Sequence, residues 1–241
     1  MEWFESWFDT PYYHLLYSNR DYTEAENFIT KLTADLQLPP NSKIIDLACG
    51  KGRHSVFLNK LGYNVLGLDL SRQSIEFDKQ FENQTLVFDV HDMRNSINAD
   101  PMDAVFNLFT SFGYFDYESD DRKVFHSVYN ALKPGGFFVL DYLNEEFVRK
   151  NIVPQSTVNR GDIEFNITKK IEGRHIIKDI RFEDKGKSYH FFEKVKLHTL
   201  EAINSYAEEC GFERIKIWGD YQLNAFDKEN SPRCINLFKK K

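Results

Sequence analysis

Cysteine is scarce in this 241-residue sequence, and its placement argues against two common kinds of site. The three cysteines, Cys49, Cys210 and Cys234, are far apart, and none forms a C-x-x-C motif or accompanies a histidine at metal-ligand spacing. A dispersed, odd-numbered set of cysteines is typical of a reducing compartment, where disulfide frameworks are rare. We therefore expect no structural zinc or other metal site, and a cytoplasmic protein.

Long hydrophobic runs are missing as well. No apolar stretch approaches the roughly 18 residues that a membrane-spanning helix needs. The opening residues, "MEWFESWFDTPYY", carry acids where a secretory signal would carry lysine or arginine. We expect neither secretion nor a membrane partner.

An excess of positive charge is also absent, since 37 acidic residues outnumber 31 lysines and arginines and the formal net charge is -6. Affinity for nucleic acids comes mainly from cations that neutralise phosphates, so we expect a small-molecule substrate and no nucleic-acid partner. Hydrophobic residues make up 41% of the sequence and charged residues 28%, as in ordinary globular proteins. A chain of this length can form one large α/β domain, or one domain with an insertion.

Strand-like and helix-like segments alternate through the first 144 residues. A capping box at Thr23 and Glu26 begins a helix over 23–36, which prolines at 39 and 40 end. The next expected elements are strand 44–47, helix 53–61, strand 64–69, helix 71–81, strand 85–88, strand 104–109, a helix ended by Pro134, and strand 137–142. This order predicts right-handed crossovers and a mostly parallel sheet, whose ligands bind at the carboxyl ends of the strands.

The pattern changes after Asn144. The segments "DIEFNITKKI", "HIIKDIRFE" and "SYHFFEKVKL", separated by glycine-containing turns, predict an antiparallel sheet of three or four strands inserted into the α/β domain. A helix, "TLEAINSYAEECGF", and two strands, "RIKIWGDY" and "RCINLF", then complete the chain. We expect the insertion to roof a substrate pocket or to pair subunits in a homodimer.

Two acids end neighbouring strands on either side of a glycine-rich turn. In "KIIDLACGKGRHS", Asp46 precedes Gly50 and Gly52, and Asp69 ends the following strand. This spacing partly matches the dinucleotide fingerprint, which keeps an NAD-dependent oxidoreductase open as an alternative. However, Ser55 occupies the third glycine position. Asp46 would also repel a pyrophosphate at the helix N-terminus by a few kcal/mol, at ~4 to 6 Å and an effective dielectric constant of ~20.

These acids favour a nucleoside-like ligand that has a cationic end instead of phosphates. S-adenosylmethionine meets this description, because its ammonium and sulfonium groups are positive and its ribose offers two hydroxyls to Asp69. The glycines would let the backbone approach the methionine portion closely. Either acid alone would be read as a helix cap or a surface residue, so the inference depends on the pair.

The same region resembles the class I S-adenosylmethionine-dependent methyltransferases, particularly their bacterial small-molecule, N-methyltransferase-like branch. "DLACGKGRHS" is similar to the first motif of that family, with Ala48 where glycine is common, and "GLDLS", "HDMRN", "DAVFNLFTSFGYF" and "LKPGGFFVLD" are similar to the next four. Their order and spacing agree over residues 44–143. The resemblance implies a doubly wound, seven-stranded, mostly parallel Rossmann-like sheet that ends in an antiparallel hairpin.

The resemblance divides the chain and assigns roles to single residues. Residues 1–43 would be an N-terminal helical lid, 44–144 with 198–241 the cofactor-binding core, and 145–197 the inserted roof or dimerisation subdomain. In this assignment Asp46, Ala48 and Gly50 contact the methionine end of the cofactor, and Asp69 contacts its ribose. Leu70, Asp92 and Met93 contact the adenine. Leu108 and Phe109 line the methyl-transfer site.

The segment "YYHLLYSNRDY" resembles the N-terminal lid of small-molecule N-methyltransferases, where a tyrosine and a basic residue close over the cofactor carboxylate. Tyr13, Arg20 and Tyr22 are the candidates for this role. An equally open alternative is that these aromatic residues only pack the first helix on the core.

Methyl transfer from a sulfonium needs alignment rather than an obligatory base, so no catalytic residue is assigned. Tyr114, which follows the fourth strand, and His190, on the inserted sheet, are the candidates to test. Enzymes that methylate amino groups of nucleic acids commonly have a proline-containing motif after the fourth strand, and this chain has "NLFT" there. This difference favours a small acceptor with a reactive nitrogen or oxygen. A module that binds the cofactor without turnover remains an alternative.

Overall fold

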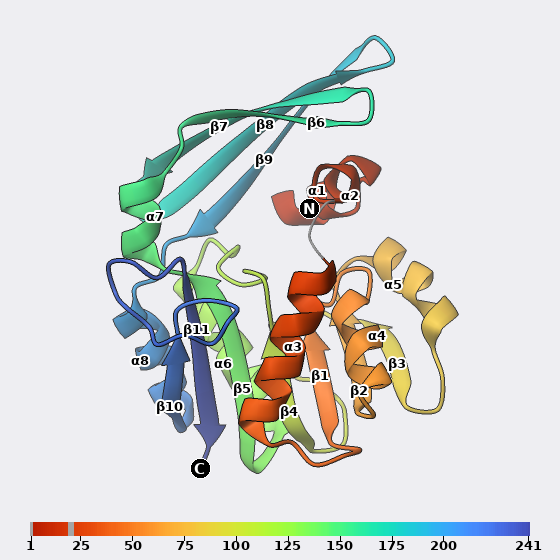
Figure 1. Ribbon diagram of the computed structural model, residues 1–241, viewed down its shortest axis with the longest axis vertical. Coiled ribbons are helices and arrows are strands. Elements are labelled where there is room, and N and C mark those ends of the chain that lie inside the picture. Colours follow the sequence, from red (N-terminus) through yellow and green to blue (C-terminus); the bar gives the residue numbers. More distant parts are fainter. Residues whose placement is uncertain (1, 19–21) are drawn as a thin grey trace.

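The predicted doubly wound sheet is confirmed in a computed structural model, which describes residues 2–18 and 22–241. Its seven strands follow the order β10-β11-β5-β4-β1-β2-β3, and β11 runs antiparallel to the six others (Figure 1). The strands are β1 (Lys43–Leu47), β2 (Asn64–Asp69), β3 (Leu86–Val90), β4 (Met102–Asn107), β5 (Leu132–Leu143), β10 (Phe212–Trp218) and β11 (Arg233–Lys240). The carboxyl ends of β1, β2, β3 and β4 therefore meet at one edge, where ligands of such sheets bind.

Helices cover both faces of this sheet. The helices α3 (Tyr22–Leu36), α4 (Arg53–Lys60) and α5 (Arg72–Asp78) pack on one face, and α6 (Glu118–Ala131) and α8 (Leu200–Cys210) pack on the other. A short 3-10 turn, η1 (Lys79–Phe81), follows α5. Phe28, Ile29 and Leu32 of α3 are fully buried, as the amphipathic pattern of this helix predicts.

Several strand boundaries differ from those expected, and the start of β5 and the end of β4 have a clear structural reason. Strand β5 begins at Leu132 rather than at 137, because Leu132 pairs with Met102 before the "KPGG" segment shifts the register by several residues. Strand β4 ends at Asn107 rather than at 109. Phe109 and Thr110 have φ values of 58° and 63°, which a strand cannot accommodate.

The predicted insertion is a separate four-stranded antiparallel sheet of order β6-β7-β8-β9, which follows α7 (Glu145–Asn151). Its strands are β6 (Gln155–Arg160), β7 (Ile163–Glu172), β8 (His175–Asp184) and β9 (Lys187–Lys196). The hairpin between β8 and β9 turns at Lys185 and Gly186, both with positive φ, as a tight two-residue turn requires.

The short helices α1 (Trp3–Phe8) and α2 (Pro11–Leu16) pack against this second sheet (Figure 1). Trp7 is buried among the aromatic and aliphatic side chains of the sheet, and its indole N–H donates to Glu193 Oε1 at 2.9 Å. Helix α3 packs instead on the seven-stranded sheet. The segment expected to be one lid therefore has two parts: α1 and α2 pack against the insertion, and α3 packs against the core sheet.

A buried ion pair joins the inserted sheet to the core. Lys196, the last residue of β9, pairs with Asp121 of α6, and the two side chains are 8% and 0% exposed. The backbone N–H of Lys196 donates to the Gly113 carbonyl at 2.8 Å, and the Lys196 carbonyl accepts from the Tyr142 hydroxyl at 2.5 Å.

Among the described residues, no helix is long and apolar enough to cross a membrane.

Replacing Lys196 by methionine should lower the free energy of unfolding by about 3 to 5 kcal/mol, because it leaves the Asp121 carboxylate buried without its ion pair. The control is Lys194→Met on the same strand, whose partner Asp116 is exposed, and which should cost less than about 1 kcal/mol. Urea denaturation measures both. Equal effects of the two substitutions would contradict this role for Lys196.

Candidate functional site

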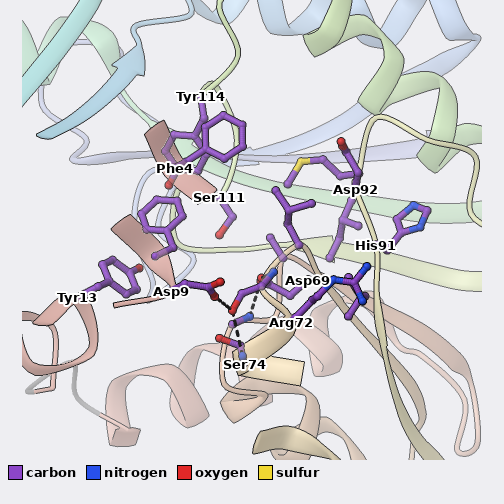
Figure 2. Close-up of a pocket in the computed structure, with 18 of the residues that line it drawn as sticks. Phe4, Asp9, Tyr13, Asp69, Arg72, Ser74, His91, Asp92, Ser111 and Tyr114 are labelled. Carbon is purple, nitrogen blue, oxygen red and sulfur yellow. Dashed lines mark hydrogen bonds between the residues drawn. The ribbon is translucent and has the colours of Figure 1, made fainter. Parts of the chain in front are cut away.

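A cavity of about 390 Å³ lies at the carboxyl ends of the strands, beneath α1 and α2 (Figure 2). We call it the first cavity. Eight of the twelve predicted cofactor contacts line it: Tyr13, Ala48, Gly50, Asp69, Leu70, Asp92, Met93 and Phe109. Residues that are distant in the sequence, from the N-terminal helices to the loop after β4, therefore meet around one space.

Asp69 joins the end of β2 to the glycine-rich loop. Its Oδ2 accepts from the backbone N–H of Gly50 and its Oδ1 from that of Ser71, both at 2.8 Å. Burial raises the pKa of Asp69, although hydrogen bonds from the backbone N–H groups of Ser71, Gly50 and Leu70 oppose this effect. A carboxylate has about four acceptor positions, so Asp69 can still accept from a hydroxyl group in the cavity.

The loop between β1 and α4 has an unusual backbone. Ala48, Gly50 and Gly52 have φ values of 63°, 57° and 63°, in the left-handed region that glycine adopts most easily. A left-handed backbone at position 48 accounts for the glycine that is common there in the motif, and the alanine of this chain adopts the same conformation. The N–H of Ala48 donates to the Leu68 carbonyl at 2.7 Å, which helps to hold that conformation.

Asp46 and Leu108, two further predicted contacts, do not line the first cavity. Asp46 is 1% exposed and accepts from the Ser55 hydroxyl at 2.6 Å, so Ser55 at the third glycine position has a defined partner. Burial raises the pKa of Asp46 to about 6, with Ser55 opposing the shift and Asp69 adding to it. Direct contact of Asp46 with a ligand stays a prediction, and Leu108 is buried behind the cavity wall.

Asp78 adds a third acid that the sequence analysis did not identify. It is fully buried on α5, and within the described part of the chain neither carboxyl oxygen has a hydrogen-bond partner. Burial, with the charges of Asp69 and Asp46, raises its pKa to about 8. Asp78 is therefore protonated and uncharged at pH 7, and attraction of a cation to this end of the cavity depends on Asp46 and Asp69.

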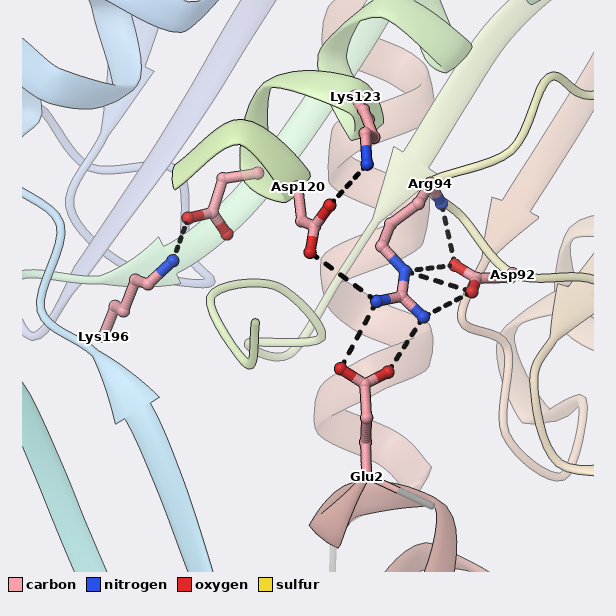
Figure 3. Close-up of polar contacts among 7 residues, drawn as sticks. Glu2, Asp92, Arg94, Asp120, Lys123 and Lys196 are labelled. Carbon is pink, nitrogen blue, oxygen red and sulfur yellow. Dashed lines mark hydrogen bonds and ion pairs between the residues drawn. The ribbon is translucent and has the colours of Figure 1, made fainter. Parts of the chain in front are cut away.

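Asp92 is held by Arg94 (Figure 3). The Arg94 guanidinium lies 2.6 Å from Asp92 Oδ2, 2.9 Å from Glu2 Oε2 and 3.7 Å from Asp120 Oδ2. Burial acts to raise the pKa of Asp92, but the hydrogen bonds from Arg94 outweigh it and the pKa is lowered. Asp92 therefore lines the cavity as an oriented carboxylate, and Arg94 connects it to the N-terminal segment.

The junction of α1 and α2 closes the cavity. Thr10 caps α2 by accepting from the Tyr13 N–H at 3.1 Å, which orients the first turn and places Tyr13 on the cavity wall. Asp9 accepts a hydrogen bond from the Ser71 hydroxyl on the opposite side (Figure 2). Of the other lid candidates, Arg20 lies outside the residues that the structure describes. Tyr22 is the first residue of α3, but its side chain is not among the described side chains.

Phe109 and Tyr114 line both the first cavity and a second cavity of about 350 Å³. The left-handed backbone at Phe109 is held by Asp141, whose Oδ2 accepts the Phe109 N–H at 2.7 Å. Tyr114 donates its hydroxyl hydrogen to the Thr110 carbonyl, and its ring packs against Trp3 and Phe8. These two rings mark the place where ligands in the two cavities would meet.

The second cavity lies between the core and the inserted sheet. Its walls come from α3, α4, the loop after β4, the end of β5, strands β7 to β9, and the segment around β11, through these residues: Glu24, Arg53, Phe109, Thr110, Tyr114, Leu143, Lys169, Ile176, Lys178, Glu193, Val195, Tyr221 and Arg233. His190 lines neither cavity. It is exposed on the opposite face of the insertion and contacts Asp179 Oδ2 at 2.6 Å, so the structure gives the catalytic prediction for His190 no support.

Several lining residues escaped the sequence analysis because their positions depend on long-range packing. Phe4, Phe8, Asp9 and His14 come from the N-terminal helices and the turn between them; a lid was expected in this segment, but no local pattern indicates which of its side chains face the cavity. Burial and the charge of Lys51 lower the pKa of His14 to about 4, so this imidazole is neutral at pH 7. The aromatic content of "MEWFESWF" was the available signal.

Comparison with known proteins agrees with this geometry. The methyltransferase-domain family matches residues 38–200, more than half of the chain. The chain belongs to this family. The expected membership of the class I S-adenosylmethionine-dependent methyltransferases is thereby confirmed, as is the expectation that the protein is an enzyme of this type.

Three relatives illustrate the range of similarity of this methyltransferase. It is 29% identical over 215 residues to a Bacillus subtilis protein named as the methyltransferase YqeM, covering 85% of each chain. It is 26% identical over 210 residues to a glycine/sarcosine N-methyltransferase of Aphanothece halophytica, covering 82% of this chain and 76% of that protein. A Clostridium acetobutylicum S-adenosylmethionine-dependent methyltransferase structure superimposes with a TM-score of 0.80 at 20% identity, covering 95% and 96% of the two chains.

Replacing Asp78 by asparagine should stabilise the protein increasingly as the pH rises. In the wild type the folded state holds a proton on Asp78 up to about pH 8, whereas the unfolded chain releases it near pH 3.8. The wild type therefore loses stability as the pH rises through this window. The gain in Tm of D78N over the wild type should grow from pH 4 to pH 8 and then level off.

Thermal unfolding across this pH range measures the gain, with Asp89→Asn on the exposed part of β3 as the matched control. A gain that is constant with pH, or one that D89N reproduces, would contradict a buried, protonated Asp78.

Proposed function

We propose that this methyltransferase holds S-adenosylmethionine in the first cavity and directs its methyl group to a nitrogen atom of a small molecule in the second cavity. The observation that carries the proposal is the pair Phe109 and Tyr114, which line both cavities. A donor on one side and an acceptor on the other would then meet in line between these rings.

The residues of the first cavity fit the cofactor group by group. Asp69 can accept from the ribose hydroxyls, and Leu70 and Met93 offer apolar contacts for the adenine, beside the Asp92 carboxylate that Arg94 orients. Asp46 and Asp69, at the ends of β1 and β2, suit a ligand with an ammonium and a sulfonium. A pyrophosphate would meet the same acids unfavourably, which disfavours an NAD-dependent oxidoreductase.

The bound cofactor would supply a methyl group on a sulfonium: the lone pair of the acceptor nitrogen would form the new N–C bond, and the S–C electron pair would stay on a neutral thioether. The protein's part is to align and to exclude water. Asp141 holds the Phe109 backbone, the Thr110 carbonyl holds the Tyr114 hydroxyl, and Phe4, Phe8 and Phe115 complete an apolar wall. Such a wall tolerates a positive charge that is dispersed between two atoms.

A nitrogen acceptor is supported by the relative named as a glycine/sarcosine N-methyltransferase, which covers most of this chain. Transfer to oxygen and binding without turnover are the alternatives that an acceptor screen separates.

A cytoplasmic location, a homodimer and the absence of a nucleic-acid partner stay predictions. The position of the inserted sheet over the second cavity supports the roof alternative for this subdomain.

Replacing Asp69 by alanine should weaken binding of S-adenosylmethionine and of S-adenosylhomocysteine by about ten- to hundred-fold. The reason is the loss of charge-assisted hydrogen bonds to the ribose, worth on the order of 1.5 to 3 kcal/mol. Isothermal titration calorimetry measures both affinities, and circular dichroism checks that the variant is folded.

Asp89→Ala, at an exposed position on the neighbouring strand β3, is the control and should bind like the wild type. A titration with NAD runs in parallel. Binding of NAD in place of S-adenosylmethionine, or no binding of either adenosyl compound by the folded wild type, would refute the proposed function.

A further inference from the structure

The inserted sheet presents a row of charged residues to the second cavity. Lys169 of β7 pairs in register with Lys178 of β8, and Lys178 pairs with Glu193 of β9. Because successive side chains of a strand alternate between faces, the three lie side by side on the face that also carries Ile176 and Val195. All five residues line the second cavity.

Two lysines directly opposite each other on one face of a sheet repel and destabilise it. Only one of this pair is compensated: Lys178 lies 3.7 Å from Glu193 Oε2 and donates to the Tyr17 hydroxyl. Glu193 in turn accepts from Trp7 and Tyr17, at 2.9 and 2.7 Å. Within residues 2–18 and 22–241, the ammonium group of Lys169 has no hydrogen bond or ion pair.

The opposite wall of the second cavity is also basic. Arg233 lies 2.6 Å from Asp141 Oδ1 and donates to Thr110 Oγ1 at 2.8 Å, so its position is fixed by the core. Arg53 lies over the Phe109 ring, 5.5 Å from its centroid. The walls thus carry four cations, with Glu24 and Glu193 as the acids that line the cavity, in a protein whose formal net charge is -6.

This charge contrasts with that of the first cavity, where Asp9, Asp69 and Asp92 outnumber Arg72, the one lysine or arginine among the described lining residues. The two cavities therefore select for ligands of opposite charge on the two sides of Phe109 and Tyr114. A ligand with an anionic group would relieve the repulsion between Lys169 and Lys178 and form charge-assisted hydrogen bonds with both.

We propose that the methyl acceptor carries an oxyanion group, a carboxylate or a phosphate, which Lys169 and Lys178 bind at the roof of the second cavity, so that its nitrogen lies at Phe109 and Tyr114. This inference rests on the proposed function and narrows the class of acceptor. Arg233, fixed on the opposite wall, limits how the anionic end can be placed.

The test is a screen of matched amines, in which the release of S-adenosylhomocysteine reports methyl transfer. Glycine, sarcosine and γ-aminobutyrate represent carboxylates, and O-phosphoethanolamine and glucosamine 6-phosphate represent phosphates. Their neutral counterparts are glycinamide, sarcosinamide, butylamine, ethanolamine and glucosamine. We expect turnover of anionic members only, and the class that reacts distinguishes a carboxylate from a phosphate.

For the best acceptor, Lys169→Met should raise KM about ten- to hundred-fold with little change in kcat, and Lys169→Arg should restore most of the loss. The control is Lys170→Met, since Lys170 pairs with Glu172 at 2.5 Å and is exposed on the same strand. Calorimetry with S-adenosylhomocysteine should give the same Kd for all three variants and the wild type.

Equal turnover of neutral counterparts, or equal kinetics of K169M and K170M, would overturn the anionic acceptor. So would the absence of turnover with every anionic member while S-adenosylhomocysteine still binds, a result that leaves the cofactor assignment standing. Failure of S-adenosylhomocysteine to bind would instead overturn the proposed function, and the acceptor proposal with it.

Discussion

The carboxylate of Asp69 accepts two backbone hydrogen bonds, one from the glycine-rich loop after β1 and one from the start of α5. These bonds tie together the two segments that form the floor of the first cavity. Ser71, whose N–H makes one of them, also donates its hydroxyl hydrogen to Asp9 of the N-terminal segment. The position of the lid over the cavity therefore depends on the same short stretch of β2 and α5 that binds the ribose in our proposal.

Charge organises the space above this floor. Acidic residues outnumber the one arginine, Arg72, among the described residues on the wall of the first cavity. Asp78 adds no charge beneath the loop at pH 7, because burial and the neighbouring carboxylates raise its pKa to about 8. Cations dominate the second cavity. A cationic methyl donor and an anionic acceptor would each be drawn to a different side of Phe109 and Tyr114, and this separation would orient the two reactants before any chemistry occurs.

The order of elements and the loop between β1 and α4 could be predicted from the sequence, because periodicity, capping residues and acid-glycine spacing are local signals. The boundary of β5 could not, since its first residue pairs with Met102 across a register shift. Asp9, Asp78 and the Lys169–Lys178 pair were missed for the same reason. Each acquires its role from a neighbour distant in the sequence, and no local pattern encodes that contact.

A crystal structure of the protein with S-adenosylhomocysteine would test the central claim most directly. The account predicts the nucleoside in the first cavity, with both ribose hydroxyls within hydrogen-bond distance of Asp69, the adenine between Leu70 and Met93, and the sulfur directed toward Phe109 and Tyr114. A nucleoside bound elsewhere, or one whose ribose does not contact Asp69, would contradict it.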